Sequence, residues 1–137
     1  MKIPNKRTIE SVMHPFPFSI GASLTVDKAI ELMQEHNIRH LPVQDAGKLV
    51  GIITDRDINF ALRIDNCEPE HLRVRDVHTA DPYAVTPDTP VYQVAAKMAH
   101  DHIGCALVVD KNNLVGIFTT VDACRLLSEV LADKLEQ

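Results

Sequence analysis

The stretch GIITDRD at residues 51–57 returns as GIFTTVD at residues 116–122, 65 positions later in a chain of 137 residues. At that shift, residues 12–58 align with residues 77–123 without a gap, and 13 of the 47 pairs are identical. About three identities are expected from average composition. The chain therefore contains two copies of one structural unit, and such an internal repeat decides the fold.

Each copy predicts the order strand, helix, strand, strand, helix. In the first helix, apolar residues follow the i, i+3, i+4, i+7 spacing of a helix with one buried face. They are Val26, Ala29, Ile30 and Met33 in copy one, and Val91, Val94, Ala95 and Met98 in copy two. Two short apolar runs then flank DAGK (45–48) or DKNN (110–113), which are hairpin turn sequences. A second helix is expected from about Asp57 and about Asp122.

A single copy can bury little apolar surface, so we expect the two copies to share a core. The predicted fold class is α/β, with two pseudo-twofold β-α-β-β-α repeats packed sheet to sheet. This symmetry would create two equivalent clefts between the repeats. We expect repeat one at residues 8–64, repeat two at 73–127, and a helical extension at 128–137.

The repeated Thr-x-x-Asp has two interpretations. Thr54 and Asp57, like Thr119 and Asp122, have the spacing of a helix capping box, in which the threonine caps and the acidic residue lies in the first turn. Alternatively, the N–H groups at the helix start and the threonine hydroxyl could bind a phosphate, while the carboxylate accepts hydrogen bonds from a ribose. The preceding glycine would allow close approach of backbone. The second interpretation predicts a nucleotide as the ligand.

The sequence resembles a tandem pair of CBS domains, also called a Bateman module. The resemblance covers about residues 8–125 and depends on HLPVQDAGKLVGIITDRDI (40–58) and CALVVDKNNLVGIFTTVDA (105–123). It is supported by the openings IESVMHPFPFSI (9–20) and LRVRDVHTADPYAVTPDTPV (72–91). The resemblance implies regulatory binding of an adenosine-containing ligand, with AMP, ADP, ATP or S-adenosylmethionine as the family's ligands.

The same resemblance implies a role for specific residues. Asp57 and Asp122 would hold ribose, and Thr54 and Thr119 would hold phosphate. Adenine would rest near Phe18 and Ser19 in one cleft, and near Tyr83 and Ala84 in the other. Arg39 and Arg56 would contact phosphate in copy one, where copy two has Gly104 and Val121. One strong site is therefore expected rather than two equal ones, although the cleft that Arg39 serves stays open.

Composition excludes several classes of protein. The net charge is −5, and no basic cluster is interleaved with aromatic residues, so no nucleic acid partner is expected. No apolar run approaches the roughly 20 residues that span a membrane, and MKIPNKRTIESV lacks the apolar run of a signal peptide. We therefore expect a cytoplasmic protein. Three separated cysteines predict reduced thiols rather than a disulfide framework.

We expect neither an enzyme nor a metal site. The chain has no P-loop, no Gly-x-Ser-x-Gly and no His-Glu-x-x-His, and the group His100, Asp101, His102 and Cys105 lacks a clear ligand pattern. His14 and His78, early in each copy, could contact ligand or solvent. The predicted function is therefore a free-standing homodimeric sensor of an adenine nucleotide such as AMP, which signals to an unknown effector and needs no cofactor. The alternatives are a ligand-free scaffold, or a sensor of S-adenosylmethionine or an NAD-type ligand.

Overall fold

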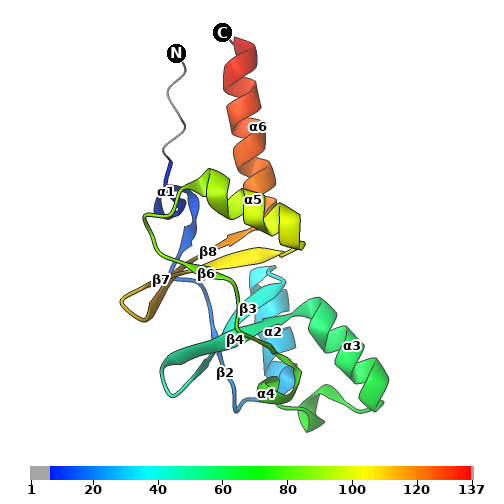
Figure 1. Ribbon diagram of the computed structural model, residues 1–137. Coiled ribbons are helices and arrows are strands. Elements are labelled where there is room, and N and C mark those ends of the chain that lie inside the picture. Colours follow the sequence, from blue (N-terminus) through cyan, green and yellow to red (C-terminus); the bar gives the residue numbers. More distant parts are fainter. Residues whose placement is uncertain (1–6, 137) are drawn as a thin grey trace. The chain divides into compact units, whose positions relative to one another are not determined.

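The computed structural model describes residues 7–136, and the side chains of residues 7–133. Residues 1–6, which belong to the segment judged not to be a signal peptide, and Gln137 of the predicted extension lie outside the described residues. The chain forms two compact units. One unit is Pro17–Pro82, and the other joins the chain up to Phe16 to the chain from Tyr83 onward. Figure 1 shows both units, each with a sheet and its helices.

The unit Pro17–Pro82 contains a four-stranded sheet in the order β2-β3-β4-β5. Its strands are β2 (Ile20–Gly21), β3 (His40–Asp45), β4 (Lys48–Thr54) and β5 (Thr79–Ala80). Its helices are α2 (Val26–His36), α3 (Asp55–Asp65), the 3-10 turn η1 (Pro69–His71) and α4 (Val74–Val77). Strand β2 is parallel to β3, and the other pairs are antiparallel.

The other unit repeats this plan with a sheet in the order β1-β8-β7-β6. Its strands are β1 (His14–Pro15), β6 (Ala84–Val85), β7 (Cys105–Asp110) and β8 (Asn113–Thr119). Its helices are α1 (Ile9–Val12), α5 (Val91–Asp101) and α6 (Thr120–Glu136). The predicted helices and hairpins of both copies are confirmed, and so is the α/β fold class with its repeated β-α units.

The helical stripes form the cores as predicted. Val26, Ala29 and Met33 are the buried residues of α2, while Val91, Val94 and Met98 are those of α5. They pack against the apolar strand residues of their own unit, such as Leu41 and Val43 in one core and Ala106 and Phe118 in the other. Each unit therefore has its own hydrophobic core, which aliphatic side chains fill almost entirely.

Both hairpin turns place two residues at positive φ. Ala46 and Gly47 have φ of 52° and 79°, and Lys111 and Asn112 have φ of 52° and 69°. Two consecutive left-handed residues define the type I′ turn, whose twist matches that of the strands it joins. The predicted turns at 45–48 and 110–113 are therefore confirmed.

The leading segment of each repeat pairs with the other repeat's sheet, a pairing that no sequence pattern indicates. Strand β1 of copy one pairs with β8 of copy two through His14 and Ile117, and β5 of copy two pairs with β4 of copy one through Thr79 and Ile52. This exchange explains the repeated glycine. A Cβ on Gly51 would overlap the Thr79 carbonyl oxygen, and one on Gly116 would overlap the side chain of Met13.

Candidate ligand site at the strand-to-helix junctions

The motif of copy one forms a capping box where β4 ends and α3 begins. The Asp57 N–H donates to Thr54 Oγ1 at 3.1 Å, and the Thr54 N–H donates to Asp57 Oδ2 at 3.1 Å. These reciprocal bonds satisfy two backbone donors at the helix start. Because Thr54 is the cap, α3 begins at Asp55, two residues before the predicted start.

The motif of copy two has the same geometry but more partners. The Thr119 N–H donates to Asp122 Oδ2 at 2.8 Å, and the Asp122 N–H donates to Thr119 Oγ1 at 3.3 Å. The Thr119 hydroxyl also donates to Asp122 Oδ2 at 3.0 Å. Helix α6 begins at Thr120, again two residues before the predicted start. The capping interpretation of Thr-x-x-Asp thus describes both junctions.

Other N–H groups at these helix starts also have partners within the chain. The N–H of Asp55 donates to the Arg39 carbonyl at 3.2 Å, and the N–H of Thr120 donates to the Gly104 carbonyl at 3.1 Å. The N–H of Arg56 donates to the carboxylate of Asp55 at 2.9 Å. The start of α3 therefore has few donors left for a phosphate, so a bound phosphate would depend mainly on side chains.

In copy one, the side chains predicted to contact a ligand lie at one end of the sheet. Phe18 and Ser19 come directly before β2, whose Ile20 is level with Val43 of the parallel strand β3. Strand β3 starts at His40, which faces Thr54 across the sheet. Because paired strands bring their flanking residues together, Phe18 and Ser19 lie at the end of the sheet that carries Thr54 and Asp57.

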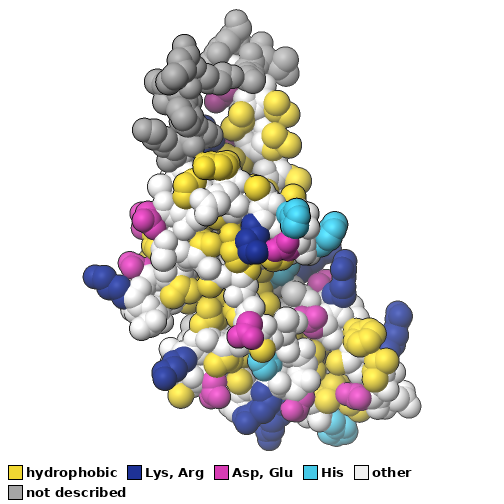
Figure 2. All heavy atoms as spheres, in the orientation of Figure 1, with side chains coloured by type: hydrophobic (Ala, Val, Ile, Leu, Met, Phe, Trp, Pro, Cys, Tyr) yellow, Lys and Arg dark blue, Asp and Glu magenta, His cyan; other side chains and the backbone are white. Residues whose placement is uncertain are grey.

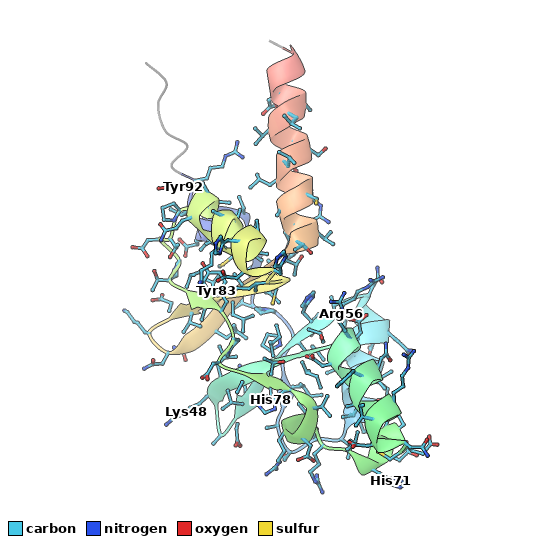
Figure 3. All side chains as sticks on the ribbon, turned by 45° about the vertical axis from the view of Figure 1, so that its right-hand side comes forward. Lys48, Arg56, His71, His78, Tyr83 and Tyr92 are labelled. Carbon is cyan, nitrogen blue, oxygen red and sulfur yellow. The ribbon has the colours of Figure 1, made fainter. Side chains whose placement is uncertain are left out.

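An aromatic pair forms part of this end of the sheet. The Phe18 ring stacks on the His36 ring with centroids 3.7 Å apart and planes 15° from parallel. The Phe18 side chain is nevertheless half exposed. In copy two, Tyr83 instead packs against the core of its unit, and Lys97 Nζ of α5 lies 5.6 Å from its ring centroid. Figure 3 labels Tyr83 beside α5. The two predicted adenine positions are therefore not equivalent.

Two arginines flank the copy-one junction. Arg39 precedes β3 and Arg56 lies in the first turn of α3, where Figure 3 labels it. Both side chains are exposed, and neither forms an ion pair with any carboxylate among the side chains described. These guanidinium groups could therefore meet an anionic ligand without first breaking an internal ion pair.

His40 belongs to the same junction, although sequence reasoning gave it no role. Burial lowers the pKa of His40 from 6.5, the nearby carboxylates of Asp55 and Asp57 raise it, and Arg39 lowers it further. The register predicts this position, because the residue that opens β3 faces the motif threonine. Its counterpart in copy two is Cys105, which faces Thr119, and burial raises the pKa of that thiol to about 12. Copy two therefore has an inert neutral group where copy one has an imidazole.

The His-rich end of α5 forms a surface ion-pair group. Hydrogen bonds from Lys97 at 2.7 Å and from His100 at 2.8 Å lower the pKa of Asp101 to about 2. Among the described residues, no three His, Cys, Asp or Glu side chains gather in an arrangement that could hold a metal ion. In the same part of the chain, no helix has the length and apolarity needed to cross a membrane.

Both repeats of the chain match the model of one known protein family. The family model described as "CBS domain" matches residues 9–64 and again residues 74–129. The chain belongs to the CBS domain family. It is a tandem CBS pair, as the sequence resemblance implied, and the two matches together span most of its length.

Individual relatives agree with this assignment. The chain is 37% identical over 120 residues to L-aspartate semialdehyde sulfurtransferase of Methanocaldococcus jannaschii, covering 86% of this chain and 23% of that enzyme. It spans less than a quarter of the length of that enzyme and of the homoserine O-acetyltransferase of Methanohalobium evestigatum. A CBS domain-containing protein of Dictyostelium discoideum is 31% identical over 137 residues, covering 92% of this chain and 94% of that one.

A solved structure shows the same fold. The CBS domain pair of protein MJ0100, in complex with 5′-methylthioadenosine and S-adenosyl-L-methionine, has a TM-score of 0.82 and 32% identity. The match covers 90% of this chain and 97% of that chain.

Proposed function

We propose that this CBS pair senses an adenine nucleotide such as AMP, ADP or ATP and passes the bound state to a partner protein. The observation that carries the proposal is the copy-one junction. Within one unit it combines a motif carboxylate, Asp57, with a half-exposed aromatic ring, Phe18, and two exposed guanidinium groups, Arg39 and Arg56. These groups match the ribose, the base and the phosphate of a nucleotide.

The exposed arginines of this junction support a phosphate-bearing ligand. Phosphate is recognised by guanidinium groups, which offer several donors in a fixed plane. Arg39 and Arg56 are exposed at the start of α3, where the carboxylates of Asp55 and Asp57 also lie, so the arginines supply donors there rather than a net positive charge. A second candidate is a sulfur-containing adenosyl ligand, favoured by the 5′-methylthioadenosine and S-adenosyl-L-methionine bound to the related CBS pair. That ligand would use Asp57 and Phe18 but would not need the arginines.

A catalytic role has little support from the residues. At the copy-one junction, the side chains of Thr54 and Asp57 already bond to each other's backbone as a cap. The enzymes named above are matched over only about a quarter of their length. A third candidate, a scaffold with no ligand, would use Thr-x-x-Asp as a cap alone.

We expect the exposed apolar residues of two helices to bind another copy of this chain. Helix α3 exposes Phe60 and Ile64, one turn apart, and α6 exposes Val121, Leu127 and Leu131. Figure 2 shows hydrophobic side chains along the described part of α6. Exposed apolar residues that recur along helices are typical of protein interfaces. A homodimer is therefore proposed, and sedimentation equilibrium would test it.

Calorimetric titration tests the proposed function. The wild-type protein would be titrated with AMP, ADP, ATP, 5′-methylthioadenosine, S-adenosylmethionine and NADH. Asp57→Asn keeps an oxygen for the capping bond but removes the charge, and should weaken binding by about 10- to 100-fold. Asp65→Asn, at the other end of α3, is the matched control and should leave affinity unchanged. If no ligand binds, the scaffold candidate stands instead.

A further inference from the structure

The two motif carboxylates differ in how completely the chain itself satisfies them. Asp122 is 6% exposed and is the one charged residue that is buried in the part of the chain described. Besides its bonds with Thr119, the Asp122 carboxylate accepts at Oδ1 from Arg125 Nη1 at 3.0 Å, and the same oxygen lies 2.9 Å from His14 Nε2. In copy one, Asp57 Oδ2 accepts from Thr54, and no donor among the described residues reaches Asp57 Oδ1.

The sequence accounts for this difference. At the 65-residue shift, His14 corresponds to Thr79 and Arg125 corresponds to Phe60. Both donors that hold Asp122 Oδ1 are thus absent from copy one, and Phe60 is 68% exposed rather than turned toward Asp57. Since the capping bonds are common to both copies, the extra donors are not needed to start the helix.

The extra donors occupy the position that a ribose would need. A vicinal diol binds a carboxylate by donating two hydrogen bonds to its oxygens. At Asp122, the Arg125 guanidinium already donates to Oδ1, the His14 imidazole lies within ion-pair distance of the same oxygen, and Thr119 donates two bonds to Oδ2. A ligand at this junction must therefore displace the charge-assisted hydrogen bond from Arg125 and the His14 contact, whereas a ligand at Asp57 meets neither.

We propose that the chain fills its second ligand site with its own side chains, and that His14 and Arg125 restrict it to one ligand per chain, bound at Asp57. The inference rests on the proposed function for the ligand, but the closed state of Asp122 does not depend on a ligand. Because His14 lies in β1, the exchanged strand, the same contact also ties the leading segment of copy one to the first turn of α6.

Because the two copies align residue by residue, each copy can be given the residues of the other as matched variants. His14→Thr with Arg125→Phe gives copy two the residues of copy one, and Thr79→His with Phe60→Arg does the reverse. All four positions are exposed in the structure, so these changes should leave the cores intact. Circular dichroism and a thermal melt of each variant would verify this before binding is measured.

The first readout needs no ligand. Carboxylates are labelled with a carbodiimide and glycine ethyl ester, and the rates at Asp57 and Asp122 are followed by mass spectrometry. We expect Asp122 to react at least about tenfold more slowly than Asp57 in the wild type, and to approach the Asp57 rate in His14→Thr/Arg125→Phe. Equal wild-type rates, or an unchanged Asp122 rate in that variant, would overturn the proposal.

The second readout is stoichiometry by calorimetry with AMP and with 5′-methylthioadenosine. We expect one ligand per chain in the wild type, lost in Asp57→Asn, and two in His14→Thr/Arg125→Phe. Thr79→His/Phe60→Arg should weaken the Asp57 site by at least about tenfold. Two equal wild-type sites, or a single site lost in Asp122→Asn, would overturn the proposal. If neither these probes nor ADP and ATP bind to any variant, the proposed function is refuted instead, and the labelling rates alone then test whether the Asp122 site is closed.

Discussion

The backbone N–H of Thr54 donates to the carboxylate of Asp57, and the backbone N–H of Asp57 donates to the hydroxyl of Thr54, both at 3.1 Å. The residues proposed to bind a nucleotide are therefore also those that start helix α3. Their structural and ligand roles must be separated by substitutions that change one role at a time.

Removing the cap of helix α3 should lower the stability of the protein even when no ligand is present. Thr54→Ala should reduce the free energy of unfolding by about 1 kcal/mol, because the Asp57 N–H loses its acceptor. Thr54→Ser keeps the hydroxyl and should be close to wild type. Urea denaturation measures both. Equal stability of Thr54→Ala and wild type would show that the cap contributes nothing to folding.

The two repeated glycines should respond differently to alanine. In Gly51→Ala the new Cβ meets the backbone oxygen of Thr79, which is held in the sheet, whereas in Gly116→Ala it meets the flexible side chain of Met13. Gly51→Ala should therefore destabilise the protein by about 1–3 kcal/mol, and Gly116→Ala by less. Thermal melts of the two variants compare them, and the reverse order would contradict the strand-exchange explanation of these glycines.

The first hairpin turn can be improved. Ala46 has a φ of 52°, which asparagine adopts more readily than alanine, and Gly47 follows it. Ala46→Asn creates the preferred Asn-Gly pair and should raise the free energy of unfolding by about 0.5 kcal/mol. Ala46→Val, with a branched Cβ, should lower it. A stabilising Ala46→Val would be incompatible with a type I′ turn at this position.

His40 should make the fold less stable in mild acid. Burial, the largest cause, lowers its pKa in the folded protein below the 6.5 of an unfolded chain. Below pH 6.5 the unfolded chain binds the proton first, so stability falls as the pH drops toward the folded-state pKa. Between pH 7.5 and 5.5, His40→Gln should therefore lose less stability than wild type in urea titrations. His71→Gln, at an exposed position on η1, is the control and should follow the wild type.

Replacing Arg39 should change the affinity for a nucleotide but not the affinity for a nucleoside. If its guanidinium contacts phosphate, Arg39→Ala should weaken AMP binding about tenfold and leave adenosine binding nearly unchanged, because one charge-assisted hydrogen bond is lost. Arg63→Ala, near the other end of α3, controls for net charge. Equal losses for AMP and adenosine would remove Arg39 from the phosphate position.

The sequence predicted those parts of the fold that have a local signal. The apolar spacing of Val26, Ala29 and Met33 predicts a buried helix face because a helix repeats every 3.6 residues. The turn at Ala46 and Gly47 and the junction at Thr54 were equally local. The expected start at Asp57 lies two residues after the observed one, because the helix begins directly after its cap, Thr54.

The strand exchange had no such signal. Strands β1 and β5 are two residues long, too short to show a period of two, and their partners lie in the other repeat. The contact between His14 and Asp122 depends on that exchange, so no pattern near either residue indicates it. His40 could have been found, because its place in the register follows from the predicted hairpin.

The exchange has a consequence for how the protein is made. The partner of His14 is Ile117, 103 residues later, so β1 stays unpaired until strand β8 of the second repeat has left the ribosome. Long-range pairings of this kind form late, since the loop must close before the contact stabilises it. Neither repeat can be expressed alone with its sheet complete, and a gene truncated between the repeats would yield a sheet that lacks β5 and a β1 segment that lacks its partner strand.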